Sequence, residues 1–231
     1  MPPPETPPTK WPELSWPEVV DRAKKVIFRI VTPGGSGTGF VISRSKPREG
    51  GSIGYLLVTA WHVVSDLLPD ATLHFISTDS ETVCEALPGS YAIHRLGDDS
   101  FDTAVIFVQI RESIIAENEL LPALPADSIL PQGAELGWLG FPGITDGKLC
   151  FFSGRISGYL DAPPTYLIDG VAINGVSGGP ALDSRAHIIG LVSAYIPNRV
   201  DKFTTLPGLM ALMPIGAVRH WLEHHLQATV I

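Results

Sequence analysis

Ser177 lies in a glycine-rich stretch whose composition suits a nucleophile. The stretch is Asn174-Gly175-Val176-Ser177-Gly178-Gly179-Pro180. A serine hydroxyl is a weak nucleophile at neutral pH, so hydrolysis needs a base, a group that orients the base, and N–H donors for the developing oxyanion. Glycines adopt backbone conformations that other residues resist, and so allow successive N–H groups to point into one concavity beside Ser177. Taken alone, the stretch is as typical of an ordinary turn as of a nucleophile.

The candidate base is His62, which follows the apolar run Tyr55–Ala60. A residue just after a buried strand stands where a rigid frame gives way to a loop, and catalytic groups are often held there. A lone histidine is more often a hydrogen-bonded core residue than a base. The assignment of His62 therefore depends on the residues that accompany it.

The candidate orienting group is Asp102, at the mouth of the apolar run Thr103–Ile110. A carboxylate at the end of a buried strand is shielded from water and can accept a hydrogen bond from an imidazole. The neighbouring Asp98 and Asp99 lie in a polar turn, where consecutive acids are usually solvated. We therefore choose Asp102 and keep Asp98 and Asp99 as the fallback.

The composition predicts a β-rich protein without a broad nucleic-acid surface. Of 231 residues, 45% are hydrophobic, and the 23 glycines and 21 prolines favour many short elements joined by turns. The net charge of −8 argues against nucleic-acid binding. The first residues resemble no secretory signal and no run is long enough to span a bilayer, so we expect a cytoplasmic protein with no membrane partner.

The elements that must position these residues are mostly strands. Residues 1–14 are proline-rich and predict an extended tail or linker. Ser15 and Glu18 form a capping-box pattern for a short helix through about Lys25. Ile215, Val218, Leu222 and Leu226 have helical spacing, so we expect a closing helix over about 215–227. Strands are expected at about 26–31, 37–42, 55–60, 71–77, 81–87, 103–110, 135–142, 150–156, 165–168, 181–182, 187–195 and 209–213.

No cofactor or metal is expected. His220 and His224 are four residues apart on the closing helix, but no third ligand is apparent nearby and Glu223 is not in an HExxH arrangement. Exposed histidines at a helix end are the preferred interpretation. Cys84 and Cys150 show neither metal-ligand spacing nor a disulfide framework, and are expected to be buried free thiols.

Three segments occur in the order that one family uses. Thr59-Ala60-Trp61-His62-Val63-Val64, Phe101-Asp102-Thr103-Ala104-Val105 and Gly175-Val176-Ser177-Gly178-Gly179-Pro180 resemble the motifs of chymotrypsin-fold serine proteases. Within that fold the chain is most similar to the protease domain of the HtrA/Deg group, over about residues 19–226 and without a PDZ domain. The resemblance implies an all-β fold of two six-stranded antiparallel barrels, the first over about 26–115 and the second over about 130–214. The protease domain would then occupy residues 15–231.

The resemblance also implies a reaction and the roles of its residues. His62, Asp102 and Ser177 would form a triad that hydrolyses peptide bonds through an acyl-enzyme, and the N–H groups of Gly175 and Ser177 would form the oxyanion hole. The substrate main chain would pair along Leu191, Val192, Ser193, Ala194 and Tyr195. Val171, six residues before Ser177, would lie at the base of the specificity pocket, which implies an apolar P1 preference.

One departure from the family pattern leaves two alternatives open. Val176 stands where the family usually has a small polar residue, and an apolar side chain there alters how the oxyanion loop is set. A catalytically weak module that binds a peptide or partner protein is therefore the first alternative. The second is a latent protease that a regulatory partner activates by ordering loops around 143–148 and 157–164. The oligomeric state is left open.

Overall fold

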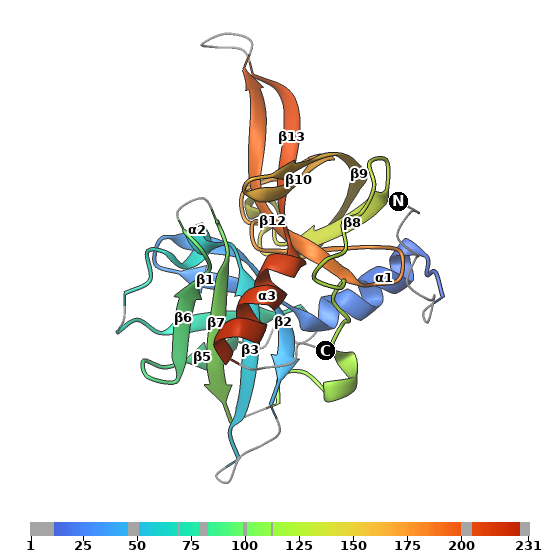
Figure 1. The fold of residues 1–231 in the computed structure, drawn as a ribbon. Coiled ribbons are helices and arrows are strands. Elements are labelled where there is room, and N and C mark those ends of the chain that lie inside the picture. The colour runs from blue at the N-terminus through green and yellow to red at the C-terminus, as the bar shows by residue number, and fades with distance from the viewer. Residues whose placement is uncertain are drawn as a thin grey trace.

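Two β-sheet halves follow one another along the chain and meet beside the C-terminal helix (Figure 1). The structure is a computed structural model, and it describes residues 12–45, 51–68, 70–78, 83–98, 101–111, 113–199 and 205–226. Most of the proline-rich segment expected at 1–14 lies outside the described residues, as does Asp99.

The first half is one antiparallel sheet of seven strands, in the order β5-β4-β1-β2-β3-β7-β6. Its central strands are nearly continuous runs of apolar and β-branched residues, which suit a sheet buried on both faces. The strands are β1 (Ile27–Thr32), β2 (Gly35–Arg44), β3 (Ile53–Thr59), β4 (Leu73–Ser77), β5 (Val83–Ala86), β6 (Tyr91–Arg95) and β7 (Ala104–Ile110).

The second half is a closed barrel of six strands, in the order β10-β13-β12-β11-β8-β9. Closure leaves no edge around the barrel wall. The strands are β8 (Glu135–Gly140), β9 (Cys150–Asp161), β10 (Pro164–Asp169), β11 (Pro180–Leu182), β12 (Ile188–Arg199) and β13 (Thr205–Pro214). β12 and β13 continue past the barrel wall as a hairpin that projects from the body of the molecule (Figure 1).

The helices are short and lie at the borders of the halves. They are α1 (Trp16–Ala23), α2 (Trp61–Val64) and α3 (Ile215–Leu226), with 3-10 turns η1 (Lys24–Val26), η2 (Glu117–Glu119) and η3 (Gly143–Thr145). At the start of α1 the Glu18 carboxylate accepts hydrogen bonds from the Ser15 backbone N–H and hydroxyl, at 2.8 and 2.7 Å. This is the capping contact that the sequence predicts.

The buried side chains form two clusters, and the larger one spans both halves. It joins the strands of the first half to buried residues of the second, such as Leu139, Leu191 and Met213, and to Val218 and Leu222 of α3. The smaller cluster fills the barrel around Trp138 and Tyr166. The α3 helix therefore connects the two halves through their shared core.

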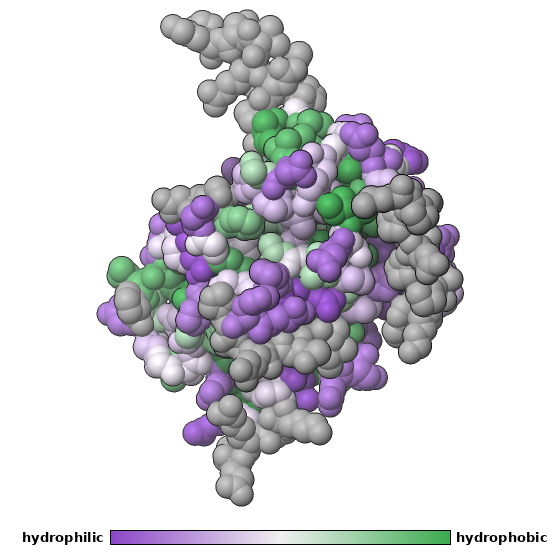
Figure 2. All heavy atoms as spheres, in the orientation of Figure 1, coloured by the Kyte–Doolittle hydropathy of each residue, from purple (hydrophilic) through white to green (hydrophobic). Residues whose placement is uncertain are grey.

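The outer surface is largely polar on the face that contains α3. Figure 2 shows hydrophilic residues over much of this face, with separate hydrophobic patches between them. No helix within the described ranges has both the length and the apolar character required to cross a membrane. Cys84 and Cys150 are free thiols as expected, but both are half-buried rather than fully buried.

The expected all-β fold with a helix near each end is confirmed, and three details differ. The first half has seven strands in one sheet, because β6 pairs with β7 where no strand was expected. Residues 157–164 were expected to form a loop; instead they are the end of β9, a tight turn and the start of β10, whose residues pair across the hairpin. The segment 143–148, expected to form a loop, begins with the 3-10 turn η3 (Gly143–Thr145), and the Thr145 hydroxyl lies within hydrogen-bond distance of Pro142 O and Lys148 O, at 2.8 and 3.0 Å.

Candidate active site

A cleft between the two halves brings His62 and Ser177 together. The cleft has a volume of about 210 Å³ and is lined by both side chains, with Gly35 and Asp66 from the first half and Asn174 and Gly175 from the second. His62 lies on the short helix α2, one turn after strand β3 ends, and Ser177 lies in the turn that precedes β11. Each residue therefore has a buried strand beside it that fixes its backbone.

His62 and Asp102 are joined by two hydrogen bonds. The His62 Nδ1 lies 2.8 Å from Asp102 Oδ2, and the His62 backbone N–H donates to Asp102 Oδ1 at 3.0 Å. The side-chain contact with an ionised carboxylate places the proton on Nδ1 and leaves Nε2 as an acceptor. The backbone contact holds the second carboxylate oxygen and so restrains rotation of the carboxylate beside the imidazole.

A third partner of Asp102 is Ser193, which comes from β12 in the other half. The Ser193 hydroxyl donates to Asp102 Oδ2 at 2.8 Å, and Ser193 is 6% exposed. The sequence placed Ser193 among residues that bind substrate, and nothing in its sequence context signalled a contact with Asp102. The Ser193 hydroxyl is thus a donor to the Asp102 carboxylate, across the boundary between the second half and the first.

These contacts shift the pKa values of both groups in the direction that a base requires. The hydrogen bond to Asp102 raises the pKa of His62 above 6.5, against the opposing effect of burial. Burial raises the pKa of Asp102, but hydrogen bonds from the His62 side chain and backbone and from Ser193 outweigh it and lower the pKa below 3.8. At neutral pH Asp102 is therefore ionised and stabilises a proton on the imidazole.

Two N–H groups beside Ser177 have no acceptor among the described residues, namely those of Gly175 and Ser177. The carbonyls of the same peptides are anchored, since Gly143 N–H donates to Asn174 O at 2.8 Å and Gly179 N–H donates to Val176 O at 2.9 Å. In a trans peptide the N–H points away from its C=O. The anchored carbonyls therefore fix the direction of both free N–H groups.

The conformation of this turn requires glycine at two positions. Gly175 has φ +96° and Gly178 has φ +84°, both in the region that side chains disfavour. A Cβ at Gly175 would also meet the Phe141 carbonyl and lie 3.0 Å from Gly143 N. Gly175 and Gly178 are therefore needed for the turn to take this conformation.

Val176 holds the same turn by packing. Its side chain is fully buried and belongs to the core of the barrel, with Leu136 and Trp138. A Cβ at Gly140 would lie within 2.9 Å of Val176 Cα and Cγ1, so the two chains are in close contact. The apolar residue that departs from the family pattern thus anchors the loop to the barrel interior.

Ser177 and His62 share the cleft without a hydrogen bond between their side chains in the described structure. Catalytic hydrogen bonds are often long or poorly aligned before substrate binds, so such an arrangement is compatible with transfer of the serine proton. The residues present could thus support nucleophilic attack with an oriented base and N–H donors.

Only part of the segment 191–195, which was expected to pair with the substrate main chain, has a free backbone edge. Leu191 and Val192 are fully buried, and β13 pairs with both on one side. On the other side Leu191 pairs with Pro180 of β11, and Val192 exchanges hydrogen bonds with Gly178 and Gly179. The assignment of these two residues to substrate pairing is corrected accordingly. Among the described residues, the backbone edge opposite β13 is open from Ser193 through Ala194 and Tyr195.

Val171 is not at the base of an enclosed pocket. Its side chain is 53% exposed, while its carbonyl accepts a hydrogen bond from Trp138 Nε1 at 3.2 Å. Trp138 also occupies the space in which a Cβ of Gly170 would lie. The backbone before the serine loop is thereby tied to the barrel core, with the Val171 side chain turned toward solvent.

Among the described residues, no group of three or more metal-binding side chains is found. His220 and His224 are exposed, with ring centroids 4.0 Å apart, and line a cavity of about 720 Å³ beside α3. That cavity is mainly aromatic and aliphatic, with Phe101, Tyr166 and Trp221 in its wall.

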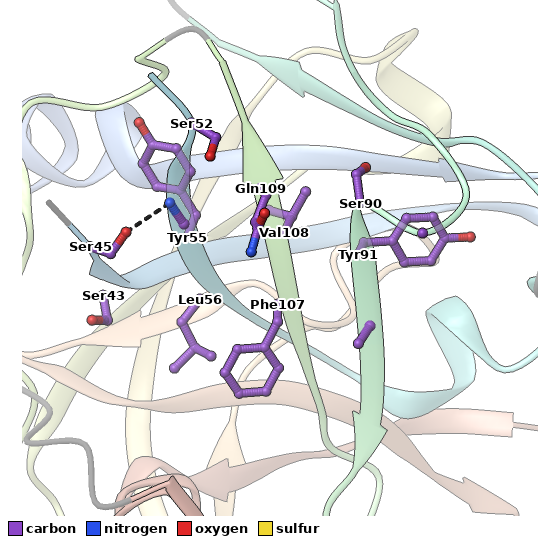
Figure 3. A pocket seen from close by; sticks show the side chains of 13 residues that line it. Ser43, Ser45, Ser52, Tyr55, Leu56, Ser90, Tyr91, Phe107, Val108 and Gln109 are labelled. Atoms are coloured by element: carbon purple, nitrogen blue, oxygen red, sulfur yellow. Dashed lines mark hydrogen bonds between the residues drawn. The ribbon is translucent and has the colours of Figure 1, made fainter. Parts of the chain in front are cut away.

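A hollow of about 380 Å³ lies over the sheet of the first half, and its lining is rich in serine (Figure 3). Two of the hydroxyls form hydrogen bonds with backbone groups: Gly54 N–H donates to Ser45 Oγ at 2.9 Å, and Ser90 Oγ donates to Leu87 O at 2.7 Å. The described residues that line it include no histidine or acid. None of its serines has a base beside it in the lining, so the cleft with His62 remains the candidate active site.

Comparison with known proteins agrees with this arrangement. A family model described as a trypsin-like peptidase domain matches residues 37–191, which include His62, Asp102 and Ser177. A search of curated proteins returned no significant match.

Similar solved structures include several proteases. The Rv3671c protease in an inactive form aligns with a TM-score of 0.60 at 21% identity, over 89% of this chain and 91% of the other; a second structure names its source as M. tuberculosis H37Rv. A serine endoprotease from Yersinia pestis aligns with a TM-score of 0.63 at 16% identity, over 91% of this chain and 66% of the other. The HtrA-type protease AlgW with a tripeptide gives 0.64 at 16%, over 93% and 65%. At these identities the likeness shows the fold alone.

Proposed function

The chain belongs to the trypsin-like peptidase family, and from this membership we propose that it is a serine endopeptidase acting on protein substrates. His62, Asp102 and Ser177 form its catalytic triad. The single observation that most supports the proposal is the two-point hydrogen bond between His62 and Asp102 at the wall of the cleft that Ser177 lines.

The proposed reaction has two steps. In the first, Ser177 Oγ attacks the substrate carbonyl carbon while His62 Nε2 takes the hydroxyl proton, and His62 then gives this proton to the leaving amine as the C–N bond breaks. In the second, His62 deprotonates a water that attacks the resulting ester, and the proton returns to Ser177 as the C–O bond breaks. Asp102 stabilises the imidazolium in both steps, and the N–H groups of Gly175 and Ser177 bind the oxyanion.

The substrate backbone is proposed to pair with the open edge of β12 at Ser193, Ala194 and Tyr195. This antiparallel pairing would place the scissile bond at Ser177 and continue the sheet outward from the barrel. We retain the proposal of an apolar P1 residue from the sequence alone: Val171, Gly170 and Ala172 carry no charge that would pair with Lys or Arg. The exposed Val171 side chain does not add to this argument. Comparable cleavage after Arg and after Leu or Val in a peptide library would contradict the apolar preference.

The test of the proposed function is labelling by a fluorophosphonate, which reacts only with an activated serine. The purified protein is compared with Ser177→Ala and with unfolded wild-type protein, and the products are read by intact mass. We expect one adduct on folded wild type and none on the two controls. A folded wild-type protein that stays unlabelled would contradict the proposal.

A module that binds peptides without turnover is the second candidate, and one observation favours it. The described structure shows no hydrogen bond between the side chains of Ser177 and His62, an arrangement that a cleft without turnover would share. A partner protein that tightens the cleft would convert such a latent site into an active one. Slow labelling that accelerates on addition of a substrate peptide or partner would identify latency, whereas peptide binding without labelling would identify a binding module.

A further inference from the structure

Thr38 of β2 is a fully buried polar residue of the first half that contacts the serine loop of the second. Its side chain lies between Gly140, at the end of β8, and Gly175. A buried hydroxyl must find partners, because an unsatisfied polar group away from water is costly. The partners of Thr38 show what the residue does.

The backbone and the hydroxyl of Thr38 each bond to the serine loop. Its hydroxyl donates to Gly175 O at 2.7 Å, and its backbone N–H donates to Ser177 O at 2.9 Å. The same hydroxyl accepts a hydrogen bond from Phe141 N–H at 3.0 Å. Thr38 therefore binds the carbonyls of the two residues whose N–H groups are the proposed oxyanion donors.

The serine loop that Thr38 contacts has little rigidity of its own at Gly175. Gly175 has no Cβ to restrict rotation, and its φ of +96° is one of many conformations open to glycine. Its two flanking peptides are instead fixed from outside, the first by the bond from Gly143 N–H to Asn174 O and the second by the Thr38 hydroxyl. The first contact lies on the peptide that carries the Gly175 N–H, and the second stops the following peptide from rotating about Gly175. Together they restrain the direction of the Gly175 N–H.

Gly140 and Gly178 pack closely against Thr38, and larger residues at these two positions would displace it. A Cβ at Gly140 would lie 2.9 Å from Thr38 Oγ1, and a Cβ at Gly178 would collide with the Thr38 carbonyl. The carbonyl also accepts a hydrogen bond from the buried Thr59 hydroxyl at 2.7 Å. The residue is held on all sides, so its hydroxyl has a fixed position relative to Gly175.

We propose that Thr38 is a positioning residue for the oxyanion hole: its hydroxyl holds the Gly175 carbonyl, and so restrains the glycine whose own N–H faces the substrate oxyanion. This inference rests on the proposed endopeptidase function. It means that a residue of the first half maintains the conformation of the serine loop, which lies in the second half. Thr38 itself touches no reacting atom. Its effect is on the transition state, since the oxyanion forms only there.

Two substitutions separate the hydroxyl from the shape of the side chain. Thr38→Val keeps the shape and removes the hydroxyl, whereas Thr38→Ser keeps the hydroxyl and removes a methyl group. Loss of one oxyanion donor costs on the order of 100-fold to 1000-fold in kcat. We expect Thr38→Val to slow fluorophosphonate labelling and to lower kcat for a peptide substrate by about 100-fold, with KM changed less than about 3-fold. Thr38→Ser should stay within about 3-fold of wild type in both.

A matched control removes a buried hydroxyl that has no contact with the site. Thr165 is 6% exposed, and its hydroxyl donates to Pro163 O at 2.9 Å. Thr165→Val should lose stability in urea while it labels at the wild-type rate. If Thr38→Val does not fold, Thr38→Ala replaces it, since alanine places no methyl group against the Phe141 N–H. Folded Thr38→Val or Thr38→Ala that labels within about 3-fold of wild type would overturn the proposal, as would an equal loss in Thr165→Val.

The amide resonances of Gly175 and Ser177 in ¹⁵N-labelled protein give a readout that needs no activity. They should shift in the variant that lacks the hydroxyl and coincide with wild type in Thr38→Ser. If wild-type protein is never labelled, the endopeptidase proposal fails, and these resonances alone decide whether Thr38 positions the loop. Unchanged resonances in a folded variant without the hydroxyl would refute the positioning role.

Discussion

At the scale of the residue, the chemistry of the site depends on how His62 is held. The imidazole has a carboxylate partner on Nδ1, and that carboxylate has a further donor in Ser193. Each contact favours the ionised form of Asp102 and a proton on Nδ1 of His62. The nitrogen that remains, Nε2, is the one that a serine proton must reach.

The acid limb of the pH profile follows from these shifts. His62 must be unprotonated to accept a proton, and the hydrogen bond to Asp102 raises its pKa above 6.5. The kcat/KM for a peptide substrate should therefore rise with pH through an apparent pKa above 6.5. In Asp102→Asn, kcat should fall by about 10⁴-fold, because the amide stabilises the wrong imidazole tautomer, and the acid limb should move to lower pH.

Asp98→Asn is the control for this measurement, because Asp98 lies in the preceding turn and His62 bonds to Asp102 instead. We expect its pH profile and kcat to match those of wild type. The assignment of the orienting group would be refuted if Asp98→Asn lost activity and Asp102→Asn retained it. Circular dichroism of both variants checks that the fold is intact.

Sequence reasoning proposed some residues of the candidate site and missed contacts made by others, for a physical reason. The stretches around His62, Asp102 and Ser177 have local signals, namely a strand end, a shielded acid and a glycine turn. Ser193 and Thr38 have none, because each acts through one hydroxyl whose partner lies in the other half of the chain. A contact between residues so distant in the sequence depends on how the two halves dock, and residue spacing alone does not contain that information.

At the scale of the element, the turn between β11 and β12 depends on Asp183. The Asp183 carboxylate accepts hydrogen bonds from the backbone N–H groups of Arg185 and His187, at 2.9 and 2.8 Å, and lies 2.9 Å from His187 Nδ1. Burial raises its pKa, but the hydrogen bonds from His187 and Arg185 outweigh this and lower the pKa below 3.8. The ionised carboxylate therefore stabilises a turn between two strands that flank the serine loop.

Asp183→Ala should lower the free energy of unfolding by about 2 kcal/mol at neutral pH, because three donors lose their acceptor. The folded pKa is below the unfolded one, so this contribution is complete above about pH 4 and is lost as the pH falls through the folded pKa. Urea unfolding at several pH values should show the difference between wild type and variant shrinking in acid. Asp21→Ala, in an exposed pair with Lys24, should change stability little at any pH.

A difference between wild type and Asp183→Ala that stayed constant down to the lowest accessible pH would contradict the role of the ionised carboxylate. It would indicate that the variant loses stability through packing alone.

Most strands could be predicted from apolar runs bounded by turn residues, and the exceptions are informative. β6 was missed because its residues alternate between half-buried and exposed positions at the edge of the sheet, which weakens the apolar signal. β9 was predicted to end near Ile156, since Ser157 and Gly158 are typical of turns. In the structure the strand continues to Asp161, because its backbone pairs with β10. Pairing with a neighbour overrides local preference in both cases.

At the scale of the whole molecule, the family resemblance carried by the three motifs predicted two sheet halves. The sequence did not show that one hydrophobic cluster joins the halves. That cluster includes Leu222 of α3, which is fully buried near the C-terminal end of the described chain. Because the core is shared, we expect the halves to unfold together.

Leu222→Ala should lower the free energy of unfolding by about 2 to 5 kcal/mol, the range for a leucine removed from a packed core. Far-UV circular dichroism and tryptophan fluorescence should still report one coincident transition in urea. Glu223→Ala, an exposed neighbour on the same helix, should leave the midpoint unchanged. Two separate transitions in Leu222→Ala or in wild type would show that the halves fold independently.

The crowding of glycines around Thr38 has a consequence for anyone who wishes to evolve this protein in the laboratory. Positions 38, 140, 175 and 178 are coupled, since a side chain added at one glycine collides with the threonine or with the backbone it holds. Single-step mutagenesis at these positions should yield almost only inactive clones. Diversity is better introduced on the projecting β12–β13 hairpin at positions such as Ile196, which is 45% exposed and lies far from these glycines in the sequence (Figure 1).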